Sequence, residues 1–271
     1  MSMIAQVPLK DGTILDVFRF ILKGKQTNLP EWVLPFAQRD LPAFWGDYYS
    51  DLWNGKHVDC CDYLYVGSIQ GTPCSRMWFG FSQKTGSGNF GNVLTLPEYR
   101  RRGIMKILLD LFISDFYESG ALFCSCDAAE SAAPAYTAAG FQRIFSEAQH
   151  PMAIVSRRVP NFSAVIKKAY GNTDSAIVRA GTFCDRFDCD KLLWYAPEVY
   201  GQVKRHPEFP DYLRLWAWTR QKHVPLYVLE TASGFCAGYA VRHHEMPFIF
   251  LHPAFEKYRE IFLYKILKEG E

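Results

Sequence analysis

The chain has 271 residues, of which 49% are hydrophobic and 21% charged, and this composition predicts a folded protein of one large or two ordinary domains. A formal net charge of +2 with scattered basic residues does not predict a nucleic-acid-binding surface. The N-terminal residues lack the apolar core of a signal peptide, and no apolar run reaches the ~20 residues that span a membrane. We therefore expect a cytoplasmic protein without a membrane anchor.

The first half of the sequence alternates between strand and helix signals. Apolar residues alternate over 13–22, whereas residues 30–54 carry aromatic side chains at helical spacing. The sequence Gln70-Gly71-Thr72-Pro73 predicts a hairpin turn, and residues 84–91 predict a flexible loop. The other predicted elements are strands at 62–69, 74–82, 92–96, 121–126, 141–146 and 152–157, and helices at 104–117 and 128–139. This order predicts a mixed α/β fold.

The second half weakly repeats the first. A proline follows a predicted strand in both halves, at Pro97 and Pro253, and an amphipathic helix comes next, but Arg259 stands in the position of Gly103. The predicted elements are a helix at 162–170, a strand at 175–183, a helix at 190–203, a hairpin at 225–230 and 234–241, a strand at 248–251 and a helix at 254–267.

This repetition predicts a domain organisation. We expect an N-terminal domain over 1–158, a linker over 159–174 and a smaller, degenerate copy of the first domain over 175–271. The alternative is an unrelated α+β appendage.

The basic turn (residues 97–103) is the most informative segment. It joins a predicted buried strand to a predicted helix and contains three consecutive arginines followed by Gly103. A helix N-terminus presents unpaired N–H groups and about half a positive charge, and glycine lets a ligand approach the backbone closely. The segment therefore predicts a seat for a phosphate group.

Together with residues 132–141, the basic turn resembles the GNAT superfamily of acyl-CoA-dependent acyltransferases, over roughly residues 13–158. The resemblance implies a GNAT-like fold and a site for acetyl-CoA, the acyl donor. The preceding strand, with Leu94, Thr95 and Leu96, would pair with the pantetheine arm. The family's pyrophosphate-binding Arg/Gln-x-x-Gly-x-Gly/Ala element is represented by Arg100, Arg101, Arg102, Gly103, Ile104 and Met105. Met105 stands where the family usually has glycine or alanine.

The second segment places Tyr136 four residues before Gly140-Phe141. In the GNAT family a tyrosine in this position commonly donates a proton to the departing thiolate, so the resemblance implies a catalytic role for Tyr136. The alternative is a packing tyrosine on a glycine-capped helix. The family often has an asparagine one or two turns earlier, where this chain has Ala129 and Ser131, so Ser131 or the backbone is expected to contact coenzyme A.

The group that accepts the amine proton is not identified by the sequence. Residues 87–96 contain neither a carboxylate nor a histidine. The candidates elsewhere are His57, Asp59, Asp62, Glu147 and His150, and for each of them the sequence favours a solvated loop residue over a proton acceptor.

The aromatic residues of the first half leave two interpretations open. The aromatic residues of 30–54 are consistent with an acceptor pocket and equally with a helix-to-sheet core; they include Trp32, Trp45, Tyr48, Tyr49 and Trp53.

The sequence does not predict a metal site. No Cys-x-x-Cys pair occurs, and the adjacent His243 and His244 would point to opposite faces of a strand.

The expected function is direct transfer of an acetyl or other acyl group from acetyl-CoA to an amine of a small molecule or peptide, in a ternary complex. The alternative is a non-catalytic protein that senses coenzyme A or binds a partner. We expect a monomer or a homodimer, and no nucleic-acid partner.

Overall fold

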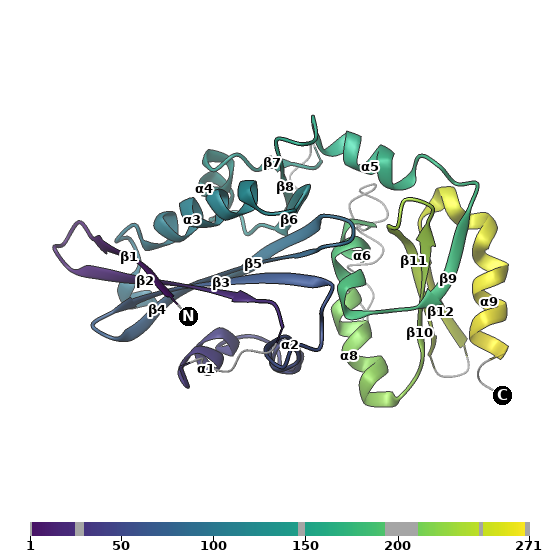
Figure 1. Ribbon diagram of the computed structural model, residues 1–271, viewed down its shortest axis with the longest axis horizontal. Coiled ribbons are helices and arrows are strands. Elements are labelled where there is room, and N and C mark those ends of the chain that lie inside the picture. The colour runs from purple at the N-terminus through teal and green to yellow at the C-terminus, as the bar shows by residue number, and fades with distance from the viewer. Residues whose placement is uncertain (1, 25–29, 146–149, 193–210, 244–245, 269–271) are drawn as a thin grey trace. The chain divides into compact units, whose positions relative to one another are not determined.

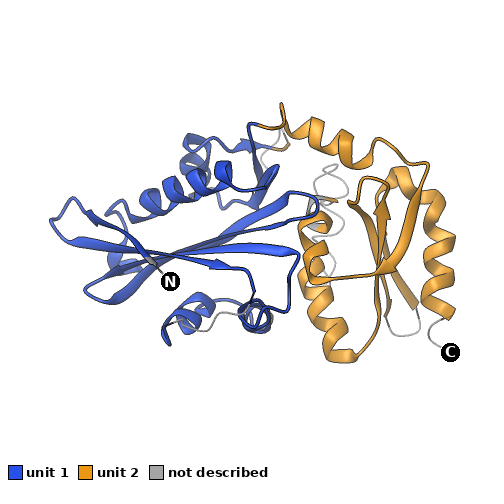
Figure 2. Ribbon diagram, viewed as in Figure 1, with its two compact units in different colours: residues 1–143, 148–157 blue, residues 144–147, 158–271 orange. Residues whose placement is uncertain are grey.

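The computed structural model describes residues 2–24, 30–145, 150–192, 211–243 and 246–268 (Figure 1). The chain forms two compact units, of which the first comprises Met1–Arg143 with Ala148–Arg157 and the second Ile144–Glu147 with Arg158–Glu271 (Figure 2). Among the described residues, no helix is both long and apolar enough to cross a membrane.

The first unit is built on an eight-stranded mixed sheet with the order β1-β2-β3-β4-β5-β6-β8-β7. Only the β5–β6 pair is parallel, and the other neighbours are antiparallel. The strands are β1 (Ser2–Pro8), β2 (Ile14–Leu22), β3 (Cys60–Ile69), β4 (Thr72–Ser82), β5 (Ser87–Thr95), β6 (Phe123–Asp127), β7 (Gln142–Arg143) and β8 (Pro151–Val155). The predicted mixed α/β class is confirmed.

Two local predictions for this sheet have different outcomes. The β3–β4 hairpin is confirmed, and its turn residues Gln70 and Gly71 both have a positive φ, as a two-residue hairpin turn requires. The predicted loop at 84–91 is wrong, because β5 already begins at Ser87. A Cβ at Gly88 would lie 3.0 Å from the carbonyl oxygen of Gly80 and 3.1 Å from that of Phe123, so the small residues of this segment serve close strand pairing.

Helices cover both faces of this sheet (Figure 1). α3 (Ile104–Glu118) and α4 (Ala133–Ala138) lie on one face, where Phe79, Phe90 and Phe112 form part of the apolar core. α1 (Val33–Gln38) and α2 (Phe44–Trp53) lie on the other face.

The aromatic residues of α2 pack on the sheet. The ring of Trp78 on β4 lies 5.8 Å from that of Trp45 and 6.2 Å from that of Tyr48. Tyr48 and Tyr49 are fully buried. For these two tyrosines the structure supports the core interpretation over an acceptor pocket.

The second unit contains a four-stranded antiparallel sheet with the order β12-β11-β10-β9. Its described elements are α5 (Phe162–Tyr170), β9 (Ala176–Ala180), η2 (Phe183–Asp185), α6 (Arg186–Leu192), α8 (Tyr212–Lys222), β10 (Leu226–Thr231), β11 (Cys236–His243), β12 (Met246–Leu251), η3 (Pro253–Tyr258) and α9 (Arg259–Lys268). The helix predicted at 190–203 begins earlier, at Arg186, and its residues from 193 onward lie outside the described residues. The helix α8 was not predicted.

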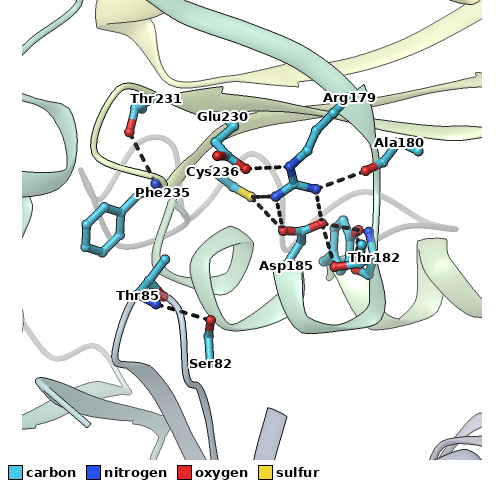
Figure 3. Close-up of polar contacts among 11 residues, drawn as sticks. Ser82, Thr85, Arg179, Ala180, Thr182, Asp185, Glu230, Thr231, Phe235 and Cys236 are labelled. Carbon is cyan, nitrogen blue, oxygen red and sulfur yellow. Dashed lines mark hydrogen bonds and ion pairs between the residues drawn. The ribbon is translucent and has the colours of Figure 1, made fainter. Parts of the chain in front are cut away.

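A charged network joins the strands of this second sheet to η2 (Figure 3). The Arg179 guanidinium donates to both oxygens of Asp185, at 2.8 and 2.6 Å, and to Glu230 at 2.5 Å. Burial alone would raise the pKa of Asp185, but the hydrogen bonds and charge of Arg179 outweigh it and lower that pKa. The network therefore holds an ionised carboxylate inside the second unit.

Candidate functional site

The site begins where β5 and β6 separate. The two strands pair only at Ser87–Phe123, Gly88–Cys124 and Asn89–Ser125, and in the described structure β5 then continues to Thr95 without β6 beside it. A cavity of about 780 Å³, here called the β5–β6 cavity, lies at this split. Of the residues assigned from the sequence, Leu94, Thr95, Arg100, Arg101, Gly103, Ile104, Met105, Ser131 and Tyr136 line it.

A β-bulge shapes β5 beside the cavity. The β4–β5 register shifts between Arg76 and Trp78, and Asn92 in the bulge has a φ of 52°. The buried Arg76 guanidinium donates to the carbonyl of Asn92 at 3.2 Å and to the carbonyls of Phe36 and Arg39 at 2.7 and 2.6 Å. The Asn92 side chain donates to the Tyr49 hydroxyl at 2.9 Å. These bonds fix the bulge against α1 and α2.

The basic turn takes a left-handed conformation at two residues, Arg101 with a φ of 64° and Gly103 with a φ of 87°. In the described structure the N-terminus of α3 has no side-chain cap and no acidic residue in its first turn. Its first N–H groups therefore remain available to an anion, beside the guanidinium groups of Arg100 and Arg101. A Cβ on Gly103 would meet no described atom within 4 Å, so the space in front of this glycine is open.

Two residues assigned to the site from the sequence are placed elsewhere. Arg102 pairs with Asp11 at 2.9 Å, donates to the carbonyl of Glu98 at 3.2 Å and lies over the Tyr99 ring. Leu96 is buried. Neither lines the β5–β6 cavity.

Tyr136 lies on α4 and lines the same cavity. Its side chain is buried, and its ring packs edge-on against Phe90 at 5.2 Å and beside Phe141 at 5.7 Å. Burial, with a smaller contribution from Cys126, raises the pKa of the phenol above its ordinary value. The hydroxyl has no hydrogen-bond partner among the described residues, so a ligand in the cavity can receive its proton or hydrogen bond.

The candidates for the proton acceptor do not line this cavity. Asp62 is fully buried and accepts hydrogen bonds from the Tyr48 hydroxyl and, at 2.8 Å, from the Trp78 indole. His57 lies 3.9 Å from Asp51, and a ring nitrogen of His150 lies 3.0 Å from the carbonyl of Ala128. Asp59 is exposed outside the cavity, and Glu147 lies outside the described residues.

Sequence reasoning missed one carboxylate, that of Asp127. Asp127 is the last residue of β6 and lines the cavity, where it is the only acidic side chain among the described lining residues. A parallel strand pair ends at one edge of a sheet, so the last residue of each strand is the position to inspect. The sequence shows Asp127 at the end of an apolar strand, but its place beside the cavity becomes visible only once β5 is known to pair with β6.

Cys126 also lines the cavity, and it bears on the reaction route. Burial, with a contribution from Asp127, raises the pKa of the Cys126 thiol far above its ordinary value. A thiol that stays protonated is a poor nucleophile. The burial of Cys126 therefore disfavours a covalent cysteine intermediate.

The corresponding turn of the second unit has a different conformation. None of the described residues 252–259 has a positive φ, and η3 runs directly into α9 at Arg259, which has a φ of −57°. The N-terminus of η3 is capped by His252, whose Nδ1 accepts from the N–H of Ala254 at 3.1 Å. Burial lowers the pKa of His252 to about 4, so the ring is neutral and can accept. This turn lacks the left-handed residues of the basic turn.

Comparison with known proteins finds no matching protein-family model and no matching curated protein. The solved structures that the chain resembles are GNAT acetyltransferases, and they cover its N-terminal half. Gcn5 from Tetrahymena is 14% identical with a TM-score of 0.38 and covers 54% of this chain and 99% of its own. ElaA from Escherichia coli is 12% identical with a TM-score of 0.38 and covers 51% and 99%.

A further solved neighbour is a GNAT family acetyltransferase from Elizabethkingia anophelis with acetyl-CoA bound. It is 12% identical with a TM-score of 0.36 and covers 52% of this chain and 97% of its own. At such identities and TM-scores the likeness carries no argument about activity, which depends on the site itself.

Proposed function

We propose that the protein transfers an acyl group, in the simplest case acetyl, from a coenzyme A thioester to an amine. One observation carries the proposal: a single cavity connects the uncapped N-terminus of α3 with the buried phenol of Tyr136 along an unpaired strand edge. An anion seat and a protonated hydroxyl in one cavity match a ligand that has a diphosphate and a thioester.

The open edge of β5 accounts for the arm between the diphosphate and the thioester. From Asn89, the last paired residue, to Thr95 the strand advances about 20 Å at ~3.3 Å per residue. Backbone groups on the edge of this stretch that faces away from β4 can pair with the amides of an extended pantetheine arm, as an added strand would. Leu94 and Thr95 lie on this path, and Arg100, Arg101 and the first turn of α3 bind the diphosphate.

Tyr136 acts on the leaving group in this proposal. A phenol is protonated at neutral pH, and burial raises the pKa of Tyr136 further, so the hydroxyl stabilises the departing thiolate as a hydrogen-bond donor. Since the Cys126 thiol is also held protonated, transfer proceeds directly within a ternary complex.

The test is calorimetric titration with acetyl-CoA, followed by measurement of thiol release with a panel of primary amines. Binding together with amine-dependent release supports the proposal. Binding without release on every amine supports the alternative, a protein that binds coenzyme A without catalysis. If saturating coenzyme A leaves the melting temperature unchanged, the β5–β6 cavity is not a coenzyme A site.

Tyr136→Phe removes the hydroxyl and keeps the ring. We expect kcat with acetyl-CoA to fall by about 10²-fold, because a thiolate stabiliser acts in the transition state, while the Kd for acetyl-CoA stays nearly unchanged. Steady-state kinetics and calorimetry measure the two quantities. Tyr117→Phe, on α3 outside the cavity, is the matched control and should leave both unchanged.

Leaving-group chemistry separates a catalytic hydroxyl from a packing one. A thioester of a more acidic thiol needs less help to depart, so the loss in Tyr136→Phe should shrink with such a donor. An unchanged kcat in this variant would exclude the hydroxyl from the reaction.

A further inference from the structure

We propose that Asp127 is the catalytic residue that binds a positively charged amine acceptor and takes its proton, an inference that rests on the acyl transfer proposed above. It assigns the acceptor to the class of primary alkylamines, which carry an ammonium group at neutral pH. Three features of Asp127 support this role: the face of the sheet on which it lies, its level along the strands and the charges around the cavity.

The face follows from side-chain alternation along β6. Cys124 and Cys126 belong to the core cluster that also contains Phe112 of α3. Successive side chains of a strand point to opposite faces, so Asp127 faces away from α3, toward the side of the sheet that α1 and α2 cover (Figure 1). Asp127 is exposed, whereas the four residues before it in β6 are buried.

The level follows from the β5–β6 register. Because Asn89 pairs with Ser125, two further residues bring β6 to Asp127 and β5 to Gly91. Gly91 pairs with Trp78, whose ring packs against α2, so this position of β5 faces the same side as Asp127. A Cβ built on Gly91 would meet no described atom within 4 Å. There is thus open space beside the split, on the face toward which Asp127 points.

The charges around the cavity are separated along its length. Arg100, Arg101 and Lys106 line it near the N-terminus of α3, five or more residues farther along the chain than Thr95, the end of β5. Asp127 lines it near the start of the split and contributes the only carboxylate among the described lining residues. A donor whose diphosphate lies at the basic end would extend its thioester toward Asp127, and an ammonium group would be attracted to the same place.

The reaction balances with one proton acceptor. The acceptor binds as R–NH₃⁺ beside the Asp127 carboxylate. The ammonium gives one proton to water, because only the neutral amine has a lone pair. As that lone pair forms the C–N bond with the thioester carbonyl carbon, the nitrogen becomes cationic, and the Asp127 carboxylate takes one of its two remaining protons. Collapse of the adduct breaks the C–S bond, and the proton held by Asp127 passes to the departing thiolate. The products are the amide, the thiol and the proton already released to water.

The order of these events follows from basicity. A carboxylate is too weak a base to deprotonate a free alkylammonium ion to any large extent, so the small neutral fraction of the bound amine attacks. Bonding to the carbonyl carbon makes the nitrogen cationic and much more acidic, so proton transfer to Asp127 follows attack. The position of Asp127 beside the thioester end of the cavity suits this timing.

The experiment compares Asp127→Asn with wild type, using acetyl-CoA as donor and two acceptor sets: primary alkylamines, and arylamines that are uncharged at neutral pH. We expect kcat/KM for the alkylamines to fall by about 10²-fold or more, with a much smaller fall for the arylamines and an unchanged Kd for acetyl-CoA. Asp127→Glu should restore part of the alkylamine activity. Glu130→Gln is the matched control, because Glu130 is an exposed carboxylate three residues away that does not line the cavity.

Each other outcome contradicts the proposal in a distinguishable way. If Asp127→Asn retains full activity with every amine that wild type uses, or loses alkylamine and arylamine activity equally, Asp127 does not act on an ammonium group. If wild type turns over only uncharged amines, the acceptor class is wrong. If wild type binds no acetyl-CoA, the proposed acyl transfer itself fails, and this inference with it.

Discussion

Gly103→Ala is expected to weaken binding of acetyl-CoA by about tenfold or more, equivalent to at least ~1.4 kcal/mol. Gly103 has a φ of 87°, a conformation that costs an alanine about 1–2 kcal/mol. The turn can relieve this strain only by rotating toward a right-handed conformation. Such a rotation redirects the N–H groups at the start of α3, on which the diphosphate would depend. Calorimetric titration with acetyl-CoA measures the loss.

Gly71→Ala is the matched control for this variant. Gly71 has a φ of 78°, and a Cβ on either glycine would meet no described atom within 4 Å, so the two substitutions impose the same kind of strain without a steric clash. Gly71 lies in the β3–β4 turn and does not line the β5–β6 cavity. Both variants should lose similar stability on heating, and only Gly103→Ala should lose affinity. Equal affinities in the two variants would show that the conformation of the basic turn is not needed for binding.

The basic turn was predictable because its function depends on local sequence. A strand, a proline, arginines and a glycine before a helix occupy consecutive positions, and the structure places most of them on one cavity. The fate of Arg102 was not predictable, because its partner Asp11 lies about ninety residues earlier in the chain. Sequence proximity to a site does not determine which way a long side chain turns.

Residues 84–91 and Asp127 depend on a strand pairing that the composition of the sequence does not report. Glycine and serine at 86–88 have the composition of a loop, yet Gly88 lies in β5, where an added Cβ would lie about 3 Å from carbonyl oxygens of β4 and β6. The pairing of this segment with β6 connects residues 36 apart in the chain, and composition does not report it. Without that pairing, Asp127 is one charged residue after an apolar strand, and nothing places it beside a thioester.

In the second half, Arg259 stands in the position of Gly103, and the turn there has no left-handed residue among 252–259. The same repetition did not reveal what stabilises the second unit. Its charged network joins β9, β10 and η2, and it was not visible from the spacing of Arg179, Asp185 and Glu230.

Arg179→Met is expected to destabilise the second unit by about 3 kcal/mol at neutral pH, near the lower end of the range for breaking a buried ion pair. The substitution keeps an apolar side chain of similar length but leaves the carboxylates of Asp185 and Glu230 without their cation. The side chains of these two residues are only 7% and 13% exposed, so water compensates them poorly. Urea unfolding measures the change, and hydrogen exchange of the β9–β11 amides assigns it to this unit.

Arg259→Met is the matched control, because Arg259 forms an ion pair with Glu256 on the surface of the same unit. Their side chains are 41% and 56% exposed, and an exposed pair of this kind contributes less than about 1 kcal/mol. Equal losses in the two variants would mean that the Arg179 network contributes no more than a surface pair.

The pH dependence of Arg179→Met separates the loss of charge pairing from the loss of packing. In wild type the pKa of Asp185 is lowered, so the stability from this pair is present above the unfolded pKa of about 4 and is lost as pH falls below it. In the variant, burial acts without the arginine and raises the pKa of Asp185, so the folded state gains stability by binding a proton as pH falls. The difference between the two proteins should therefore narrow from pH 7 toward pH 4. A difference that stays constant over this range would mean that Arg179 stabilises the unit through its apolar contacts, and that the ionic network of Figure 3 is energetically neutral.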